Sequence, residues 1–156
     1  MIPFVLIDKP MRRLGLALLL ACGGGALAQS AAQPPLDGVA LQAGMHNIRA
    51  EVARTPLQRQ AGLMFRQQMA AHEGMLFVFD TPERQCFWMR NTPLPLSIAF
   101  IADDGSIVNI ADMQPLSEAS HCSAQPVRFA LEMNQGWFAK RGIKPGFKLK
   151  GAPFGN

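Results

Sequence analysis

The fold of this chain is constrained most strongly by short segments in which apolar side chains alternate with other side chains. The clearest is residues 127–133, where every second position is apolar: Val127, Phe129, Leu131 and Met133. Residues 46–53 show the same period of two, which is typical of a β-strand because successive side chains point to opposite faces. The segments predicted as strands are residues 39–41, 46–53, 74–79, 85–91, 96–101, 106–113, 127–133 and 147–149.

Turn residues separate these segments and predict mainly hairpin connections. Residues 103–105, Asp-Asp-Gly between two apolar segments, have the chemistry of a hairpin turn. Two short helices are expected, one after the N-cap Thr55 and one at residues 135–141, which Gly142 ends. The predicted fold class is α+β: a single domain with a mostly antiparallel curled sheet or small barrel and two short helices. No glycine-rich loop follows a strand, which argues against a nucleotide-binding fingerprint.

Residues 1–28 have the features of a secretory signal peptide. Arg12 and Arg13 precede an apolar run at residues 14–21, and the Ala-Leu-Ala of residues 26–28 fits a cleavage site. The apolar run is too short to span a bilayer, which takes about 20 apolar residues. The sequence therefore predicts export, with a periplasmic or secreted mature protein.

Cleavage after Ala28 would leave a flexible leader at residues 29–37 and one domain at residues 38–152. Two alternatives remain at the N-terminus. Met11 is an alternative start, and Cys22 ends a segment that resembles a lipoprotein cleavage box. Contact with a membrane is expected only if Cys22 is lipidated.

The charge of the mature chain argues against a nucleic-acid partner. Removal of the signal peptide takes Lys9, Arg12, Arg13 and Asp8 with it, which lowers the formal charge from +4 to about +2. Nucleic-acid binding needs a concentrated basic face, and the basic residues near the C-terminus are explained as well by a solvated surface.

Two cysteines remain in the mature chain, and we expect Cys86 and Cys122 to form a disulfide because an exported chain meets an oxidising compartment. The bond would close a loop of about 36 residues and stabilise the fold by roughly 3 to 4 kcal/mol. The alternative is a pair of free thiols, one of them catalytic or metal-binding, and His121 lies next to Cys122. Adjacent residues of an extended chain point in opposite directions, so this pair does not make a dyad by itself.

Residues 85–96 carry the strongest candidate site. Large apolar side chains are followed by a cation, an amide and a hydroxyl, which a strand that only fills a core does not need. An aromatic face, a forked cation and an amide suit a polar small molecule, an anion or a sugar in a partly apolar pocket. The candidate ligand-binding residues are Arg66, Trp88, Arg90, Asn91, Thr92 and Glu132.

A purely structural role for these residues is the alternative. Trp88 would then be a core residue, Asn91 and Thr92 would make turn hydrogen bonds, and Arg66 and Glu132 would form a buried ion pair. Strand parity also places Trp88 and Asn91 on opposite sides unless the chain twists between them.

A set of motifs runs in order along most of the chain. They are Arg59, Gly62-Leu63-Met64, Arg66, residues 74–79, residues 87–92, Pro95-Leu96, Ile98, Pro115, Ser123, Pro126, Leu131-Glu132, Gly136, Gly142-Ile143 and Gly146. With these motifs the chain resembles the domain of unknown function family 192 (DUF192) over about residues 39–149, with Arg90 where lysine is common and Met133 where leucine is usual. The resemblance implies a small mixed α/β domain around a curled sheet, often secreted, without an established activity but with a suggested sugar-related role.

These features favour a periplasmic binding or accessory module for a polar small molecule or sugar-like ligand, without a cofactor or metal site. One alternative is an envelope hydrolase that uses Glu132 with a second carboxylate such as Asp112. Against an enzyme, the histidines (His46, His72 and His121) lie in separate segments, and no serine lies in a Gly-x-Ser-x-Gly elbow.

A copper-binding protein is the other alternative, because methionine and histidine supply soft ligands. The mature methionines occupy mostly apolar-periodic positions without clustering, which core filling explains better. They are Met45, Met64, Met69, Met75, Met89, Met113 and Met133.

Overall fold

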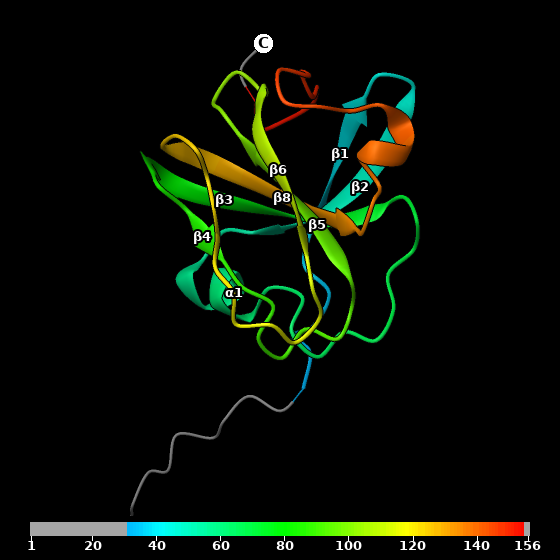
Figure 1. Ribbon diagram of the computed structural model, residues 1–156, viewed down its shortest axis with the longest axis vertical. Helices are drawn as coiled ribbons and strands as arrows, with labels where there is room; N and C mark the ends of the chain where they lie inside the picture. The colour runs from blue at the N-terminus through cyan, green and yellow to red at the C-terminus, as the bar shows by residue number, and fades with distance from the viewer. Residues whose placement is uncertain (1–30, 155–156) are drawn as a thin grey trace, which may run out of the picture.

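The computed structural model describes residues 31–154, so the predicted signal peptide and Cys22 lie outside the described residues. Strands dominate the fold (Figure 1). They are β1 (Gly38–Ala43), β2 (His46–Ala53), β3 (Glu73–Glu83), β4 (Cys86–Phe87), β5 (Leu96–Ile101), β6 (Ile107–Met113), β7 (His121–Cys122) and β8 (Val127–Asn134). One α-helix, α1 (Pro56–Ala61), and one short 3-10 helix, η1 (Ala139–Arg141), complete the described elements.

Six of the strands form one mixed sheet in the order β1-β2-β3-β8-β5-β6, and β4 and β7 form a separate small sheet. All neighbours in the large sheet are antiparallel except β2 and β3, which are parallel. The mostly antiparallel sheet is as expected, but among residues 31–154 it does not close into the small barrel that was the alternative. The parallel pair arises because the chain leaves β2, passes through α1 and residues 62–72, and returns to begin β3 in the same direction.

Only the first of the two predicted α-helices forms. At its start the Thr55 hydroxyl accepts a hydrogen bond from the Gln58 main-chain N–H at 3.2 Å, and the Gln58 side chain accepts one from the Thr55 N–H at 2.9 Å. The segment predicted as a second helix contains turns and the three-residue η1 instead. Gly136 adopts φ +75° near the start of that segment, a conformation that an α-helix cannot contain. A single remaining turn is too short to propagate as an α-helix.

Two of the predicted strands, residues 85–91 and 147–149, are also shorter than expected. Residues 85–91 pair only at Cys86–Phe87, after which the chain turns and Asn91 adopts φ +58°. The final strand reduces to two isolated bridges, Gln42 to Lys150 and Ser106 to Lys148. The Cys86–Cys122 disulfide is present as expected, because these residues lie opposite each other in the β4–β7 pair with a Cα–Cα distance of 4.0 Å.

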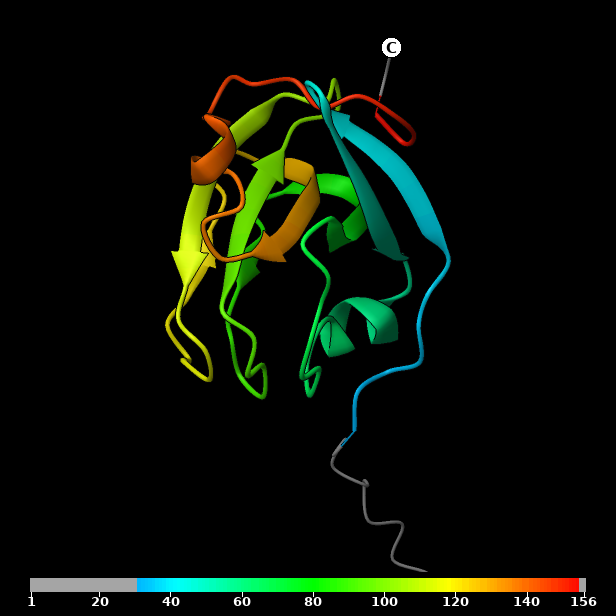
Figure 2. The same ribbon diagram turned by 90° about the vertical axis from the view of Figure 1, so that its right-hand side faces the viewer.

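The large sheet is covered on both faces. On one face, which we call the first core, Leu131 and Met133 of β8 pack with Trp137 and Phe138. The second core lies on the other face, where Met75, Phe77, Ile98 and Phe100 pack with residues of the loops after α1 and β4, including Leu63, Met89 and Leu94. Figure 2 shows α1 and several loops gathered at the end of the sheet from which residues 31–37 leave. This end is where the candidate site lies.

Candidate functional site

A pocket of about 240 Å³ opens at the edge of the second core. Three parts of the chain line it: the C-terminal part of α1 with the residues that follow, the second-core face of the sheet, and the segment from β4 to Thr92. We call it the Glu132 pocket, and its lining residues are Arg59, Gln60, Ala61, Gly62, Leu63, Met64, Phe77, Phe79, Gln85, Cys86, Phe87, Trp88, Thr92 and Glu132.

Glu132 reaches this pocket from β8, an inner strand of the sheet that pairs with both β3 and β5. Its cross-strand partners are Met75 and Ile98, which are fully buried and apolar and offer the carboxyl group no hydrogen bond. Only 4% of Glu132 is exposed, and among residues 31–154 its carboxyl group has neither a hydrogen-bond partner nor an ion pair. Burial of this kind disfavours the charged form and raises the pKa of Glu132 to about 8.

Aromatic side chains form one wall of the pocket. The Phe87 ring stands edge-on to Phe77 with centroids 4.8 Å apart and to Phe79 at 6.3 Å. Trp88 extends this wall towards solvent and is 46% exposed. The disulfide from Cys86 to β7 holds this wall in place, because β4 otherwise belongs to a sheet of only two short strands.

Arg59 is the second ionisable group of the lining, but its guanidinium is already engaged. Its Nη1 donates to the main-chain oxygen of Val78 at 2.9 Å and also to that of Arg54. The guanidinium carbon lies 5.0 Å from the centroid of the Phe79 ring. No ion pair joins Arg59 to Glu132 among the described residues, so the charge of an ionised Glu132 is left without a counter-ion from the chain.

The structure brings together three of the six predicted ligand-binding residues, namely Trp88, Thr92 and Glu132. Thr92 is buried, and its hydroxyl donates to the main-chain oxygen of Arg90 at 3.3 Å. The turn that ends β4 early explains the grouping, because the strand parity expected across residues 88–92 does not apply there.

Arg90 and Asn91 are not among the lining residues. The Arg90 guanidinium lies 5.6 Å from the Trp88 ring and 3.7 Å from the Glu118 carboxylate, both at the surface. Asn91 is exposed, and its main-chain oxygen accepts a hydrogen bond from the Phe65 N–H at 2.7 Å. Asn91 therefore has the turn role that was the structural alternative for it.

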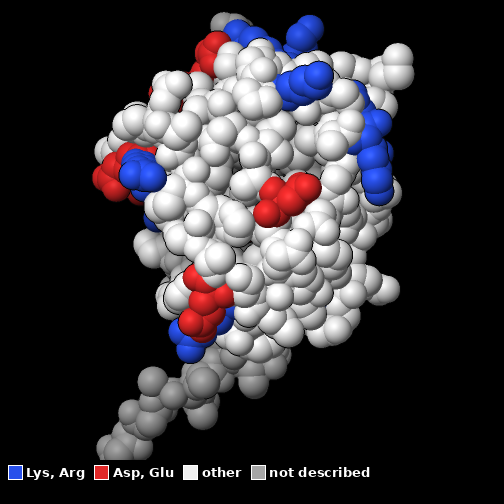
Figure 3. Space-filling view, in the orientation of Figure 1, with Lys and Arg blue, Asp and Glu red and all other residues white. Residues whose placement is uncertain are grey.

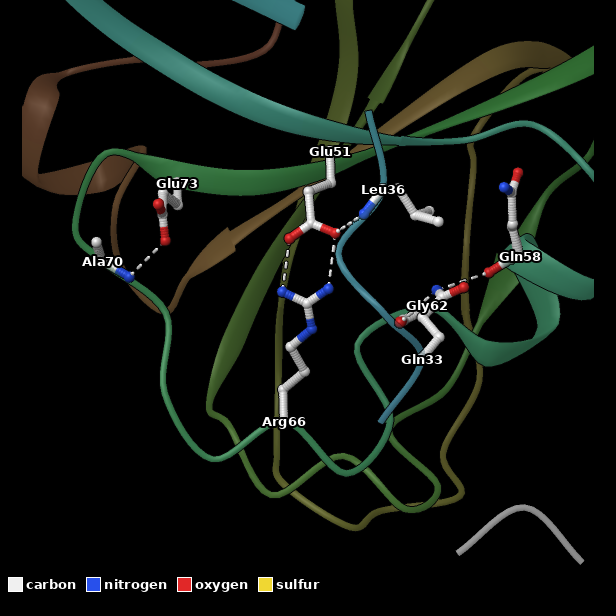
Figure 4. Close-up of polar contacts among 8 residues, drawn as sticks. All are labelled: Gln33, Leu36, Glu51, Gln58, Gly62, Arg66, Ala70 and Glu73. Atoms are coloured by element: carbon white, nitrogen blue, oxygen red, sulfur yellow. Dashed lines mark hydrogen bonds and ion pairs between the residues drawn. The ribbon is translucent and has the colours of Figure 1, made fainter. Parts of the chain in front are cut away.

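Arg66 lies in a different place and does not pair with Glu132. It donates two hydrogen bonds to Glu51, at 2.6 and 2.7 Å, and Glu51 also accepts one from the Leu36 N–H at 2.8 Å (Figure 4). Burial pushes the pKa of Glu51 upward, but the hydrogen bonds from Arg66 and Leu36 outweigh it, and the pKa lies below its ordinary value. The same figure shows Gln33 donating to the main-chain oxygens of Gln58 and Gly62, so residues 33–36 are attached beside the pocket at two points.

Asp112 is also separated from Glu132. Ile98 lies opposite Glu132 in the sheet, and the next residue, Ser97, lies opposite Asp112 and donates a hydrogen bond to it. Neighbouring residues of a strand point to opposite faces, so Asp112 and Glu132 project from opposite faces of the sheet. The proposed carboxylate pair is therefore wrong for Asp112, and Glu132 is the single carboxylate of the pocket lining.

The methionines are spread over the molecule. Met75, Met89 and Met113 pack in the second core, Met133 packs on the opposite face of the sheet, and Met45 is 90% exposed. Within residues 31–154 no group of three or more histidine, cysteine, aspartate or glutamate side chains could hold a metal ion. Core filling accounts for the buried methionines.

Part of the lining is not evident from the sequence. Residues 74–79 predict only an apolar strand, although a spacing of two places Met75, Phe77 and Phe79 on one face. The sequence marks Arg59 as a family motif residue, and its spacing from Arg66 favours an ordinary surface arginine. Nothing in its spacing shows that α1 ends beside the central strands of the sheet.

Charged side chains on the face shown in Figure 3 are scattered among uncharged residues, with several Lys and Arg along one edge. None of the helices built from residues 31–154 has the length and apolar character needed to cross a membrane.

Comparison with known proteins places the chain in a family. The DUF192 family, described as "Uncharacterized ACR", matches residues 39–151, and the chain belongs to this family. A search of curated proteins finds no match.

Two solved structures are similar to this one. A crystal structure described as a "putative transcription regulator" from Sinorhizobium meliloti 1021 has 40% identity and a TM-score of 0.73, over 77% of this chain and 98% of that one. A protein of unknown function from Novosphingobium aromaticivorans DSM 12444 has 36% identity and a TM-score of 0.68, over 81% of this chain and 99% of that one. The disulfide, which forms in oxidising compartments, fits a protein that acts outside the cytosol.

Proposed function

We propose that this protein is an exported binding module that holds a polar small molecule in the Glu132 pocket. The observation that carries the proposal is the unpartnered carboxyl group of Glu132, buried in an inner strand and facing the pocket. The carboxyl oxygens of Glu132 are not among the fully enclosed unpaired atoms of residues 31–154, so they meet the pocket and not closed protein. A ligand in the pocket could therefore supply the hydrogen-bond partner that the described residues do not.

The size of the pocket restricts the ligand. Its volume of about 240 Å³ lies below the range of roughly 300 to 1,000 Å³ that is usual for drug-sized ligands. A sugar-like ring or a short amine would be accommodated, whereas an oligomer would extend into solvent past Trp88. The aromatic wall and the few polar groups of the lining are the usual composition of a small-molecule site.

The arrangement supports binding better than hydrolysis. A glycosidase needs two carboxyl groups about 5 to 9.5 Å apart, and Glu132 is the single carboxylate of the lining. An accessory role in the periplasm or at the cell surface also fits the disulfide and the predicted signal peptide. A lipidated Cys22 would tether the same domain to a membrane without changing the pocket.

Native mass spectrometry on the unreduced protein, recovered from the envelope of its own cells, tests the proposal. A bound small molecule is expected on the wild type and not on Trp88→Ala, which removes the outer part of the aromatic wall. Leu57→Ala is the matched control, because Leu57 is also a large exposed apolar residue but does not line the pocket. An adduct that persists in Trp88→Ala, or unfolding of that variant, would refute the assignment of Trp88 to a binding site.

A further inference from the structure

We infer that the Glu132 pocket recognises an organic ammonium ion, whose charged head lies against Glu132 and whose apolar part lies against Phe77, Phe79 and Phe87. The inference rests on the proposed function, since it specifies the ligand class for the same pocket. It concerns a cation of the size of a short alkylamine or a small quaternary ammonium ion, as the pocket volume of about 240 Å³ requires.

Glu132 offers a cation an unpaired partner. Arg59 and Glu132 are the only ionisable groups of the lining, because Cys86 is in the disulfide. Arg59 keeps its positive charge, but it is held against two main-chain oxygens and the Phe79 ring, and burial alone shifts the pKa of Glu132. The residues of β3 and β5 that share the face of Glu132, including Met75, Phe77 and Ile98, are apolar. A cation entering the pocket therefore meets one unpaired carboxyl group.

The walls favour the same class of ligand. Aromatic faces attract cations, and sites that bind quaternary ammonium groups are lined by several aromatic rings. Four aromatic side chains line this pocket, and with the charged head at Glu132 their rings would contact the apolar part of the ligand. A sugar would need partners for several hydroxyl groups, but the buried part of the lining offers side-chain polar groups only from Thr92 and Glu132.

The pH dependence of binding distinguishes a cationic ligand from a neutral one, because the two select different protonation states of Glu132. Burial raises the pKa of Glu132 to about 8, so the free protein is mostly protonated there at pH 7. A cation selects the ionised form, which at pH 7 is about one-tenth of the population and at pH 9 about nine-tenths. Affinity for a cation should therefore rise about tenfold from pH 7 to pH 9, with release of nearly one proton for each ligand bound at pH 7. A neutral ligand that accepts a hydrogen bond from the protonated acid would show the opposite dependence.

The test is isothermal titration calorimetry on the unreduced mature chain with three probes: n-butylammonium chloride, tetramethylammonium chloride and methyl α-glucoside. Titrations at pH 7 and pH 9, in buffers of different ionisation enthalpy at constant ionic strength, measure affinity and proton release together. We expect at least one ammonium probe to bind about tenfold more tightly at pH 9. Glu132→Gln should bind the ammonium probe at least tenfold more weakly. Asp112→Asn changes a carboxylate on the opposite face of the sheet and should leave the affinity unchanged.

The outcomes separate the inference from the proposed function. Binding of methyl α-glucoside without binding of either ammonium probe would overturn the ammonium assignment and leave a small-molecule site in place. Ammonium binding that is equal in Glu132→Gln, provided that circular dichroism shows the variant to be folded, would also overturn it. If none of the probes binds and the native protein carries no adduct, both proposals fail.

Discussion

Replacement of Glu132 by glutamine should remove the pH dependence that this buried acid imposes on stability. Glutamine keeps the shape of the protonated side chain but cannot ionise. The pKa of Glu132 rises from an ordinary value of 4.5 to about 8 on folding, because burial disfavours the charged form. At about 1.4 kcal/mol for each pKa unit, this difference corresponds to roughly 5 kcal/mol of stability.

The direction in which stability changes with pH follows from proton binding. Between pH 4.5 and about pH 8 the folded protein holds a proton on Glu132 that the unfolded chain has lost. The stability that this proton gives the folded state is therefore fully present below pH 4.5 and is lost as the pH rises through about 8. Between pH 5 and pH 9, the free energy of unfolding of the wild type should fall by about 4 kcal/mol more than that of Glu132→Gln.

Urea denaturation of both proteins at pH 5, 7 and 9 measures this difference directly. The comparison across pH cancels any constant cost of burying the glutamine amide. Glu51→Gln is the control, because the pKa of Glu51 is lowered and its stabilising effect is lost only as the pH falls below about 4.5. Its stability difference from the wild type should stay constant from pH 5 to pH 9. Parallel pH profiles for the wild type and Glu132→Gln would refute the assignment of Glu132 as a buried, unpaired acid.

Three further changes test the structure around the pocket. Cys86→Ser combined with Cys122→Ser should lower the free energy of unfolding in urea by about 4 kcal/mol, since the disulfide closes a 36-residue loop; an unchanged midpoint would contradict this. Gly74→Ala should destabilise by about 2 kcal/mol in thermal unfolding, because the added Cβ would clash with the Met133 sulfur and lie 2.5 Å from the main-chain oxygen of Glu132; a neutral effect would show that β3 and β8 approach less closely. Arg66→Met should speed amide hydrogen exchange at Leu36, and unchanged protection would mean that the ion pair does not hold this segment.

Alternation along the chain predicted most of the strands but does not by itself show the environment of Glu132. In β8 the residues between the apolar positions include Ala130 and Glu132, which a half-buried strand would expose to solvent. In the structure both are buried, because the second core covers that face of the sheet. A period of two shows that a strand has two different faces, but it does not show whether the less apolar face meets water or a second layer of the protein.

Features that depend on neighbouring residues could be predicted from the sequence, whereas the pairing of distant strands could not. The cap at Thr55 and the pairing of Cys86 with Cys122 depend on nearby chemistry or on a small number of choices, and both are confirmed. The parallel pairing of β2 with β3 depends on how residues 54–72 cross the sheet, and only one short helix marks that crossing in the sequence. The pocket itself depends on this crossing, because it carries the end of α1 and Gly62 to the second core.

The most direct test of the Glu132 pocket is a carbon-13 NMR titration of the Glu132 side-chain carboxyl group in the mature, oxidised protein. We predict a midpoint near pH 8 in the free protein, because Glu132 is buried, and a clear shift of the midpoint to lower pH when n-butylammonium is added. A midpoint near the ordinary value of 4.5 that the probe does not change would contradict both the buried acid and its role in ligand binding.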